Sequence, residues 1–95
     1  MEVKRTAMTE IQVQKKIKTN LEKLGWYVIR LTVTGVGGMP DLVALKKDEL
    51  PFFIEVKKPV GGIVSPLQMY MGKKLRKFGF KAIVANSWEV VKAEL

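Results

Sequence analysis

The sequence predicts an α/β protein whose mixed four-stranded sheet is flanked by helices. Apolar residues recur at helical spacing over residues 9–24 and 65–78, and a glycine follows each segment. The second of these helices joins the last two strands as a crossover, which favours parallel pairing between them. The predicted order is helix, strand, strand, strand, helix, strand, helix. Aromatic and β-branched composition marks the strands: 26–31, 42–45, 52–56 and 80–85.

The first helix is predicted to begin after Thr9. The run Thr9-Glu10-Ile11-Gln12 fits a capping box, in which the Thr and Gln side chains satisfy opposite backbone groups. Gly25 can adopt the left-handed conformation that ends the helix. A glycine-rich loop at 32–39 follows the first strand, and it could bring its backbone close to a ligand. The buried stripe of the helix is expected at Val13, Ile17, Leu21 and Leu24.

The rest of the chain is organised around a hairpin of two apolar strands, 42–45 and 52–56, joined by a polar turn. Asp41 opens the first strand and can lie across from Glu55 at about 5 Å, the usual separation of opposed side chains. Lys57 projects to the same face as Glu55, because side chains alternate along a strand. Two carboxylates and an amine at one sheet edge could hold a metal ion. The alternative is an ordinary exposed Glu-Lys pair.

The second helix is predicted to begin after Ser65, because Ser65-Pro66-Leu67-Gln68 combines a capping residue, a proline at the first position and a glutamine at the third. Gly79 ends it, and Ser87 caps a short terminal helix. The expected buried residues of these two helices are Leu67, Met71, Leu75, Phe78, Trp88, Val91 and Leu95.

Composition narrows the function. Ninety-five residues suffice for a single domain, 1–95, and the absence of cysteine and histidine excludes disulfides, zinc sites and histidine catalysis. With no membrane-length apolar run and no signal peptide, we expect the cytoplasm. The balance of 17 Lys and Arg against 9 Asp and Glu gives a charge of +8. Such an excess favours a polyanionic partner, nucleic acid first, over a basic surface that only aids solubility.

Three of the polar residues also have structural explanations. Asp41 follows Pro40 in a pair that is common in turns. Gln68 fits the capping box of its own helix, and Glu10 is a favourable anion in the first turn of the other. Each explanation is sufficient for one residue taken alone. The coincidence of all three with Glu55 and Lys57 favours a site.

These motifs resemble a known family. Gly37-Gly38-Met39-Pro40-Asp41, Ile54-Glu55-Val56-Lys57 and Ser65-Pro66-Leu67-Gln68 resemble the PD-(D/E)xK nuclease superfamily, and within it a stand-alone virus-type replication-repair nuclease (VRR-NUC) domain. The resemblance implies a restriction-endonuclease-like fold. It also implies that Asp41 and Glu55 bind metal and that Lys57 is the catalytic lysine. Gln68 matches the family's helix glutamine, and Glu10 matches the acidic residue of its first helix.

The resemblance implies a Mg²⁺- or Mn²⁺-dependent, structure-selective DNA endonuclease. Stand-alone members resemble Holliday junction resolvases, which work as homodimers. For this chain, we expect a homodimer in the cytoplasm of a bacterial or phage-infected bacterial cell. The backbone carbonyl of Val56 could complete the metal ligands, and no organic cofactor or membrane is expected. The alternatives are a general metal-dependent DNA nuclease, a non-catalytic nucleic-acid-binding module of the same fold, and a small basic interaction protein. Candidate phosphate contacts are Lys15, Lys16, Lys18, Lys73, Lys74, Arg76 and Lys77.

Overall fold

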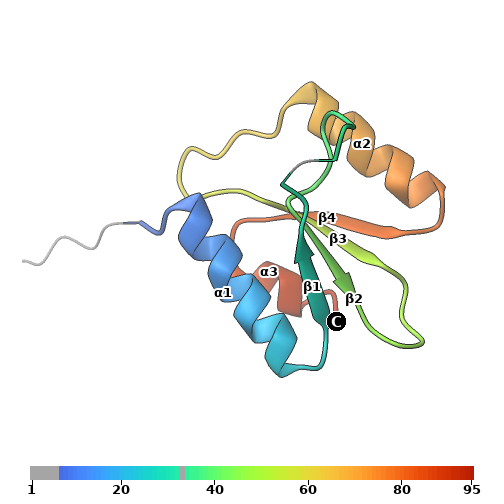
Figure 1. The fold of residues 1–95 in the computed structure, drawn as a ribbon. Coiled ribbons are helices and arrows are strands. Elements are labelled where there is room, and N and C mark those ends of the chain that lie inside the picture. The colour runs from blue at the N-terminus through green and yellow to red at the C-terminus, as the bar shows by residue number, and fades with distance from the viewer. Residues whose placement is uncertain (1–6, 33) are drawn as a thin grey trace, which may run out of the picture.

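The elements follow one another in the predicted order in a computed structural model that describes residues 7–32 and 34–95 (Figure 1). Residues 1–6 and 33 lie outside the described part. The helices are α1 (Glu10–Lys23), α2 (Pro66–Lys77) and α3 (Trp88–Lys92). The strands are β1 (Tyr27–Arg30), β2 (Leu42–Leu45), β3 (Phe52–Val56) and β4 (Lys81–Ala85).

The four strands form one mixed sheet in the order β1-β2-β3-β4. The first three strands pair antiparallel, whereas β3 and β4 are parallel, as the crossover predicts. The hairpin strands β2 and β3 are therefore the two interior strands. The site expected at a sheet edge lies instead where these interior strands meet the flanking loops.

Both long helices begin and end as the sequence predicts. Thr9 and Ser65 are the N-caps of α1 and α2, and each closes a full capping box with the glutamine three residues later. Gly25 and Gly79 follow the helix ends with φ values of 90° each, a conformation that side chains rarely adopt. Within residues 7–32 and 34–95, no helix is long and apolar enough to cross a membrane.

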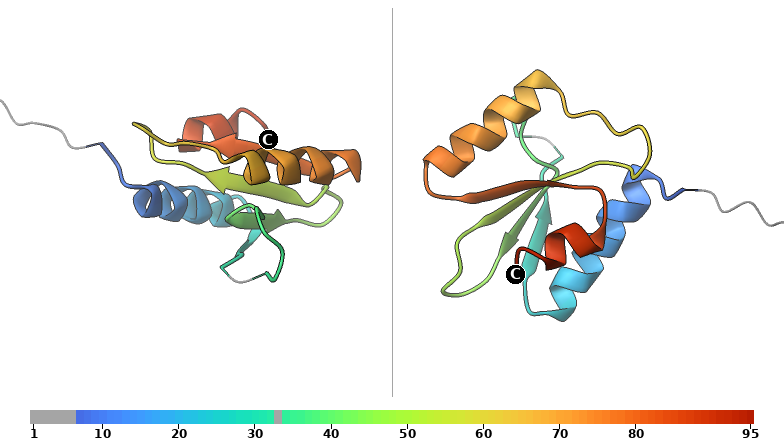
Figure 2. Two further views of the ribbon diagram at one scale, coloured as in Figure 1. Left: turned by 90° about the horizontal axis from the view of Figure 1, so that it is seen from above. Right: turned by 180° about the vertical axis from the view of Figure 1, so that it is seen from behind.

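The hydrophobic core lies on one face of the sheet, beneath α1 and α3. Side chains that alternate along β2 and β3 point into it, and the helices contribute Val13, Ile17, Leu21 and Val91. The second helix contacts β4 and lies on the other side of the strands (Figures 1 and 2). It covers only part of that face, so the two faces of the sheet are buried to different extents.

Several expected core residues are exposed. Leu24 is the C-cap residue of α1, Leu95 follows α3, and Leu67 and Phe78 lie at the two ends of α2. Because α2 rests chiefly on one strand, only its middle is covered, and Met71 is the one buried residue of this helix. The first and last strands also begin one residue later than expected, because the amides of Trp26 and Phe80 still donate to carbonyls of the preceding helices.

We predict that the two leucines near the end of α1 differ sharply in their contribution to stability. Leu21 is fully buried, whereas Leu24 is 49% exposed. Leu21→Ala should lower the free energy of unfolding by about 2–5 kcal/mol, the cost of a core cavity. Leu24→Ala should lower it by less than about 1 kcal/mol. Urea denaturation of both variants measures this, and equal losses would contradict the placement of the core.

Candidate metal centre

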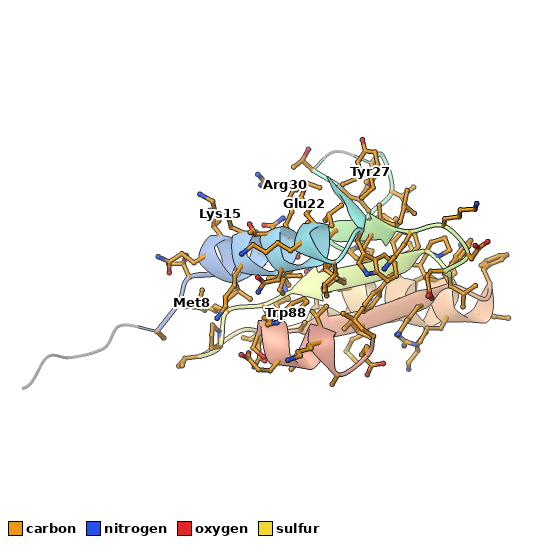
Figure 3. All side chains as sticks on the ribbon, turned by 90° about the horizontal axis from the view of Figure 1, so that it is seen from below. Met8, Lys15, Glu22, Tyr27, Arg30 and Trp88 are labelled. Carbon is orange, nitrogen blue, oxygen red and sulfur yellow. The ribbon has the colours of Figure 1, made fainter. Side chains whose placement is uncertain are left out.

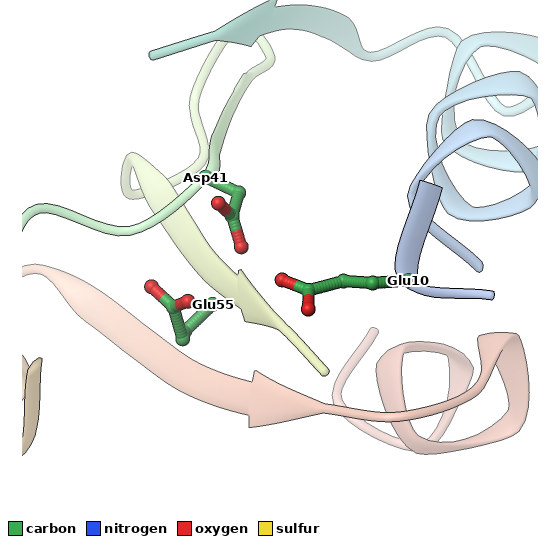
Figure 4. A group of neighbouring side chains, drawn as sticks. All are labelled: Glu10, Asp41 and Glu55. Carbon is green, nitrogen blue, oxygen red and sulfur yellow. The ribbon is translucent and has the colours of Figure 1, made fainter. Parts of the chain in front are cut away.

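Three carboxylates from distant parts of the chain meet where β2 and β3 leave the sheet. Glu10 is the first residue of α1, Asp41 immediately precedes β2, and Glu55 lies in β3. One carboxylate oxygen from each lies within 4.8 Å of the others. Figure 4 shows the three side chains converging from these elements. The helix glutamate, which alone could be explained by its helix terminus, thus belongs to a cluster.

Asp41 is held by both neighbouring strands. Its backbone carbonyl accepts a hydrogen bond from the amide of Leu31 at 2.8 Å, and its Oδ2 accepts one from the amide of Val56, also at 2.8 Å. The β2–β3 register pairs Leu42 with Ile54, so one further step places Asp41 opposite Glu55. The cross-strand arrangement expected from the sequence is present.

The carboxylate of Glu55 is the buried member of the cluster, with only 5% of the residue exposed. Its Oε1 accepts a hydrogen bond from Nε2 of Gln68 at 2.9 Å and lies 3.4 Å from Nζ of Lys57. Its Oε2 is buried and accepts no hydrogen bond from any described residue. A buried carboxylate oxygen without a partner is costly, and a bound cation would compensate it.

The environment raises the pKa of Glu55 to about 7. Burial is the largest cause, because it disfavours the charged form, and the nearby charge of Asp41 adds to it. Lys57 acts in the opposite direction but does not outweigh these two effects. Near neutral pH, this site therefore has one carboxyl that a proton or a metal ion can each neutralise.

Gln68 takes part in both the helix cap and the carboxylate cluster. Its Oε1 accepts from the backbone amide of Ser65 at 2.9 Å, which closes the capping box, while its Nε2 donates to Glu55. The cap thereby fixes which end of the amide faces the site. The structural and functional interpretations of this residue are therefore compatible.

The glycine loop approaches helix α2 rather than the carboxylates. A Cβ on Gly38 would lie 2.7 Å from the backbone oxygen of Leu67, and φ is 77° there. Only glycine permits this contact without a shift of the helix. The loop that leads to Asp41 is thus packed against the residue before Gln68. This contact brings the two halves of the site together.

Lys57 follows the last residue of β3, and its amide donates to the carbonyl of Ala85 at 3.0 Å. Only 14% of its side chain is exposed, which holds the amine beside Glu55. A Cβ on Gly62 would lie 2.9 Å from Cβ of Lys57, so the following loop folds closely against this residue. The five side chains selected from the sequence are therefore gathered in one place.

A pocket of about 150 Å³ adjoins Glu55 between α2 and β4, and sequence analysis did not predict it. Gly72 and Arg76 help to line it, and Nη1 of Arg76 donates to the carbonyl of Ala82 at 3.0 Å. Arg76, expected as a free phosphate contact, thus also ties α2 to β4. The spacing of Gly72 and Arg76, four residues apart on one face of α2, is the sequence signal that could have indicated this pocket.

The donor set suits a hard divalent cation. Three carboxylates offer oxygen atoms, and Mg²⁺ and Mn²⁺ prefer oxygen ligands. The unpartnered Oε2 of Glu55 supports this fit from the structure itself. The amide of Val56 is used by Asp41, and its carbonyl remains a predicted ligand.

The comparisons with known proteins agree with this geometry. The model of the VRR-NUC domain family matches residues 2–89 of the chain. A solved structure described as a VRR_NUC domain is 33% identical, with a TM-score of 0.79, and the match covers 90% of this chain and 94% of that one. No curated protein matches the sequence. The chain therefore belongs to the VRR-NUC domain family, a family of nucleases.

Proposed function

We propose that this protein is a metal-dependent DNA endonuclease that hydrolyses phosphodiester bonds and prefers branched DNA. The observation that carries the proposal is the cluster of Glu10, Asp41 and Glu55 with the amine of Lys57 beside it. Membership in a nuclease family supports the reaction class. A non-catalytic module would have no need to bury an incompletely bonded carboxylate in this way.

Asp41 and Glu55 would hold the metal, with Glu10 and the carbonyl of Val56 as further candidate ligands. Bound Mg²⁺ or Mn²⁺ would lower the pKa of a water molecule and offset charge that develops on the phosphate. Helix α1 presents its N-terminus with Glu10, and the positive end of the helix dipole favours the ionised carboxylate there.

The amine of Lys57 would offset negative charge on the phosphate oxygens and orient the attacking water. Gln68 has a positioning role, because its amide holds one oxygen of Glu55 and leaves the other free. Because Glu55 is buried away from water, its carboxylate interacts more strongly with neighbouring charges.

The working unit in this proposal is a homodimer in the cytoplasm, where bacterial DNA lies. Resolving a four-way junction requires two cuts related by two-fold symmetry, and an isologous dimer supplies two sites in that relation. The part of the sheet that α2 leaves uncovered carries the exposed apolar residues Tyr27, Ile29 and Leu45, a surface suited to a second copy.

The test is a cleavage assay on linear duplex, single strand, flap and four-way junction with Mg²⁺, Mn²⁺ or EDTA. Cleavage should require the metal and be fastest on branched DNA, and Glu55→Gln should abolish it while the circular dichroism spectrum is unchanged. DNA binding without any cleavage would favour the non-catalytic module. Light scattering and product mapping test the dimer. A monomer that cuts linear duplex equally well would favour a general nuclease.

We predict that a rise in pH lowers the free energy of unfolding of the metal-free protein, whereas it strengthens metal binding. Because the folded protein raises the pKa of Glu55 to about 7 from 4.5, this group stabilises the metal-free fold at low pH. That contribution is lost as pH rises through 7. Metal binds the ionised form, so its affinity should fall about tenfold per pH unit below 7.

This is measured by urea denaturation at several pH values with EDTA or Mg²⁺. The control is Glu55→Gln, which removes the titrating group. The variant should lack both the metal stabilisation and the pH dependence that this group causes. An identical pH dependence in the two proteins would assign the effect to other residues.

Lys57→Ala should lower turnover by roughly 10²-fold or more, because a positioned charge near the reacting phosphate is lost. DNA affinity measured in Ca²⁺ should change little. Lys58→Ala is the matched control, since this neighbouring lysine is exposed. Should affinity and turnover decline together in Lys57→Ala, the lysine is a phosphate contact only.

Gln68→Glu should separate the two roles of this residue. A glutamate can still close the capping box, but it places a second carboxylate oxygen against Glu55 in place of the donor. Activity should fall while the melting temperature at pH 6, where Glu55 holds its proton, is kept.

Ser65→Ala is the complementary variant. It should cost about 1 kcal/mol through the lost cap and leave the contact between Gln68 and Glu55 in place. Retained activity in Gln68→Glu together with retained stability would restrict Gln68 to capping.

A further inference from the structure

A groove of about 470 Å³ lies between α1 and the edge strand β1. The four helix residues that line it are spaced i, i+3, i+4 and i+7, so they follow one another along a single face of α1. The fifth lining residue comes from the end of β1. Together they are Ile11, Gln14, Lys15, Lys18 and Arg30.

Two residues that line the groove are neighbours of carboxylate residues in the chain or in the sheet. Ile11 directly follows Glu10 in α1, and Arg30 pairs across the sheet with Leu42, the residue after Asp41. A DNA strand bound at the carboxylates and running along α1 would therefore pass the residues of this groove.

The groove is positively charged, and its basic residues differ in whether they form an ion pair with an acidic residue. Lys15 and Arg30 are exposed, and Figure 3 shows them on the same side of α1. Among the residues that the structure describes, neither forms an ion pair, whereas Nζ of Lys18 lies 3.1 Å from Oε1 of Glu22. Lys18 is thus partly neutralised. None of the described residues that line the groove is acidic.

We infer that this groove holds the sugar–phosphate backbone of the DNA strand on one side of the bond to be cut, with Lys15 and Arg30 as its principal phosphate contacts. The inference rests on the proposed nuclease function for the identity of the ligand. Flexible cations on an open groove bind phosphates without reading bases, so the contact is independent of sequence.

The dimensions agree with this assignment. At 1.5 Å of rise per residue, Lys15 lies about 7 Å and Lys18 about 12 Å beyond Glu10 along the helix axis. A DNA strand carries one phosphate per ~3.4 Å of its own axis. The groove therefore accommodates roughly two to four phosphates beyond the metal centre.

The test uses the double variant Lys15→Ala/Arg30→Ala and a control that loses the same charge elsewhere. Lys23 is the last residue of α1, at the end opposite Glu10, and Lys47 lies in the β2–β3 turn, at the end of β2 opposite Asp41. Lys23→Ala/Lys47→Ala therefore matches the charge change far from the groove. Binding of a labelled four-way junction and a linear duplex is measured by fluorescence anisotropy in Ca²⁺ over a range of salt. Cleavage is measured in Mg²⁺.

The groove variant should lower the slope of log K against log salt by about two, because two phosphate contacts are lost. Its affinity should fall about tenfold or more relative to the control, with KM raised and kcat nearly kept. Lys18→Ala should have a smaller effect than Lys15→Ala, since Glu22 already pairs with Lys18.

The two hypotheses fail in different ways. Equal affinity and equal salt slope for the groove variant and the control would overturn the groove assignment, even if wild-type protein cleaves DNA. DNA binding that depends on the groove, without any cleavage, would instead overturn the proposed nuclease activity and support the groove assignment. Wild-type protein that binds no DNA at all would overturn the groove assignment as well.

Discussion

The burial of one carboxylate, Glu55, is the constraint on which the rest of this structure depends. An ionised group at 5% exposure is costly, and a single oxygen is satisfied by neighbouring donors. An apolar residue here would suit the metal-free fold better. A glutamate at this position is favourable only if a cation binds its unpartnered oxygen. In the proposed function, this site has lower stability in the metal-free protein and a higher affinity for a metal ion.

The surrounding elements position this carboxylate through ordinary helix and strand chemistry. The capping box of α2 fixes the amide of Gln68, and the pairing of β2 with β3 fixes Asp41. The close contact between Gly38 and Leu67 then sets the distance between the two halves. The capping box and the strand pairing are local interactions, and they satisfy backbone groups that need hydrogen-bond partners in any case. Functional geometry here is obtained largely from interactions that the fold already requires.

These local interactions explain which parts of the fold and of the candidate site the sequence predicts. Caps, glycine stops and the hairpin register follow from patterns a few residues long, so α1, α2 and the pairing of Asp41 with Glu55 are all predicted. Exposure of Leu67 and Phe78 could not be predicted, because a helical stripe does not reveal how much of a helix its partner covers. The groove with Arg30 depends on which face of β1 meets α1, a tertiary property.

The distribution of charge links the metal centre to the groove. The chain carries +8, yet its candidate metal centre gathers three carboxylates with one lysine beside Glu55, and such a cluster repels phosphate. The general excess of positive charge attracts DNA from a distance but is screened within about 10 Å at moderate salt. Close approach to the carboxylates therefore needs local compensation. In the proposed function, a divalent cation would provide it at the bond to be cut, and the cations along α1 would provide it for the neighbouring phosphates. Neither alone would place a DNA strand against this acidic site.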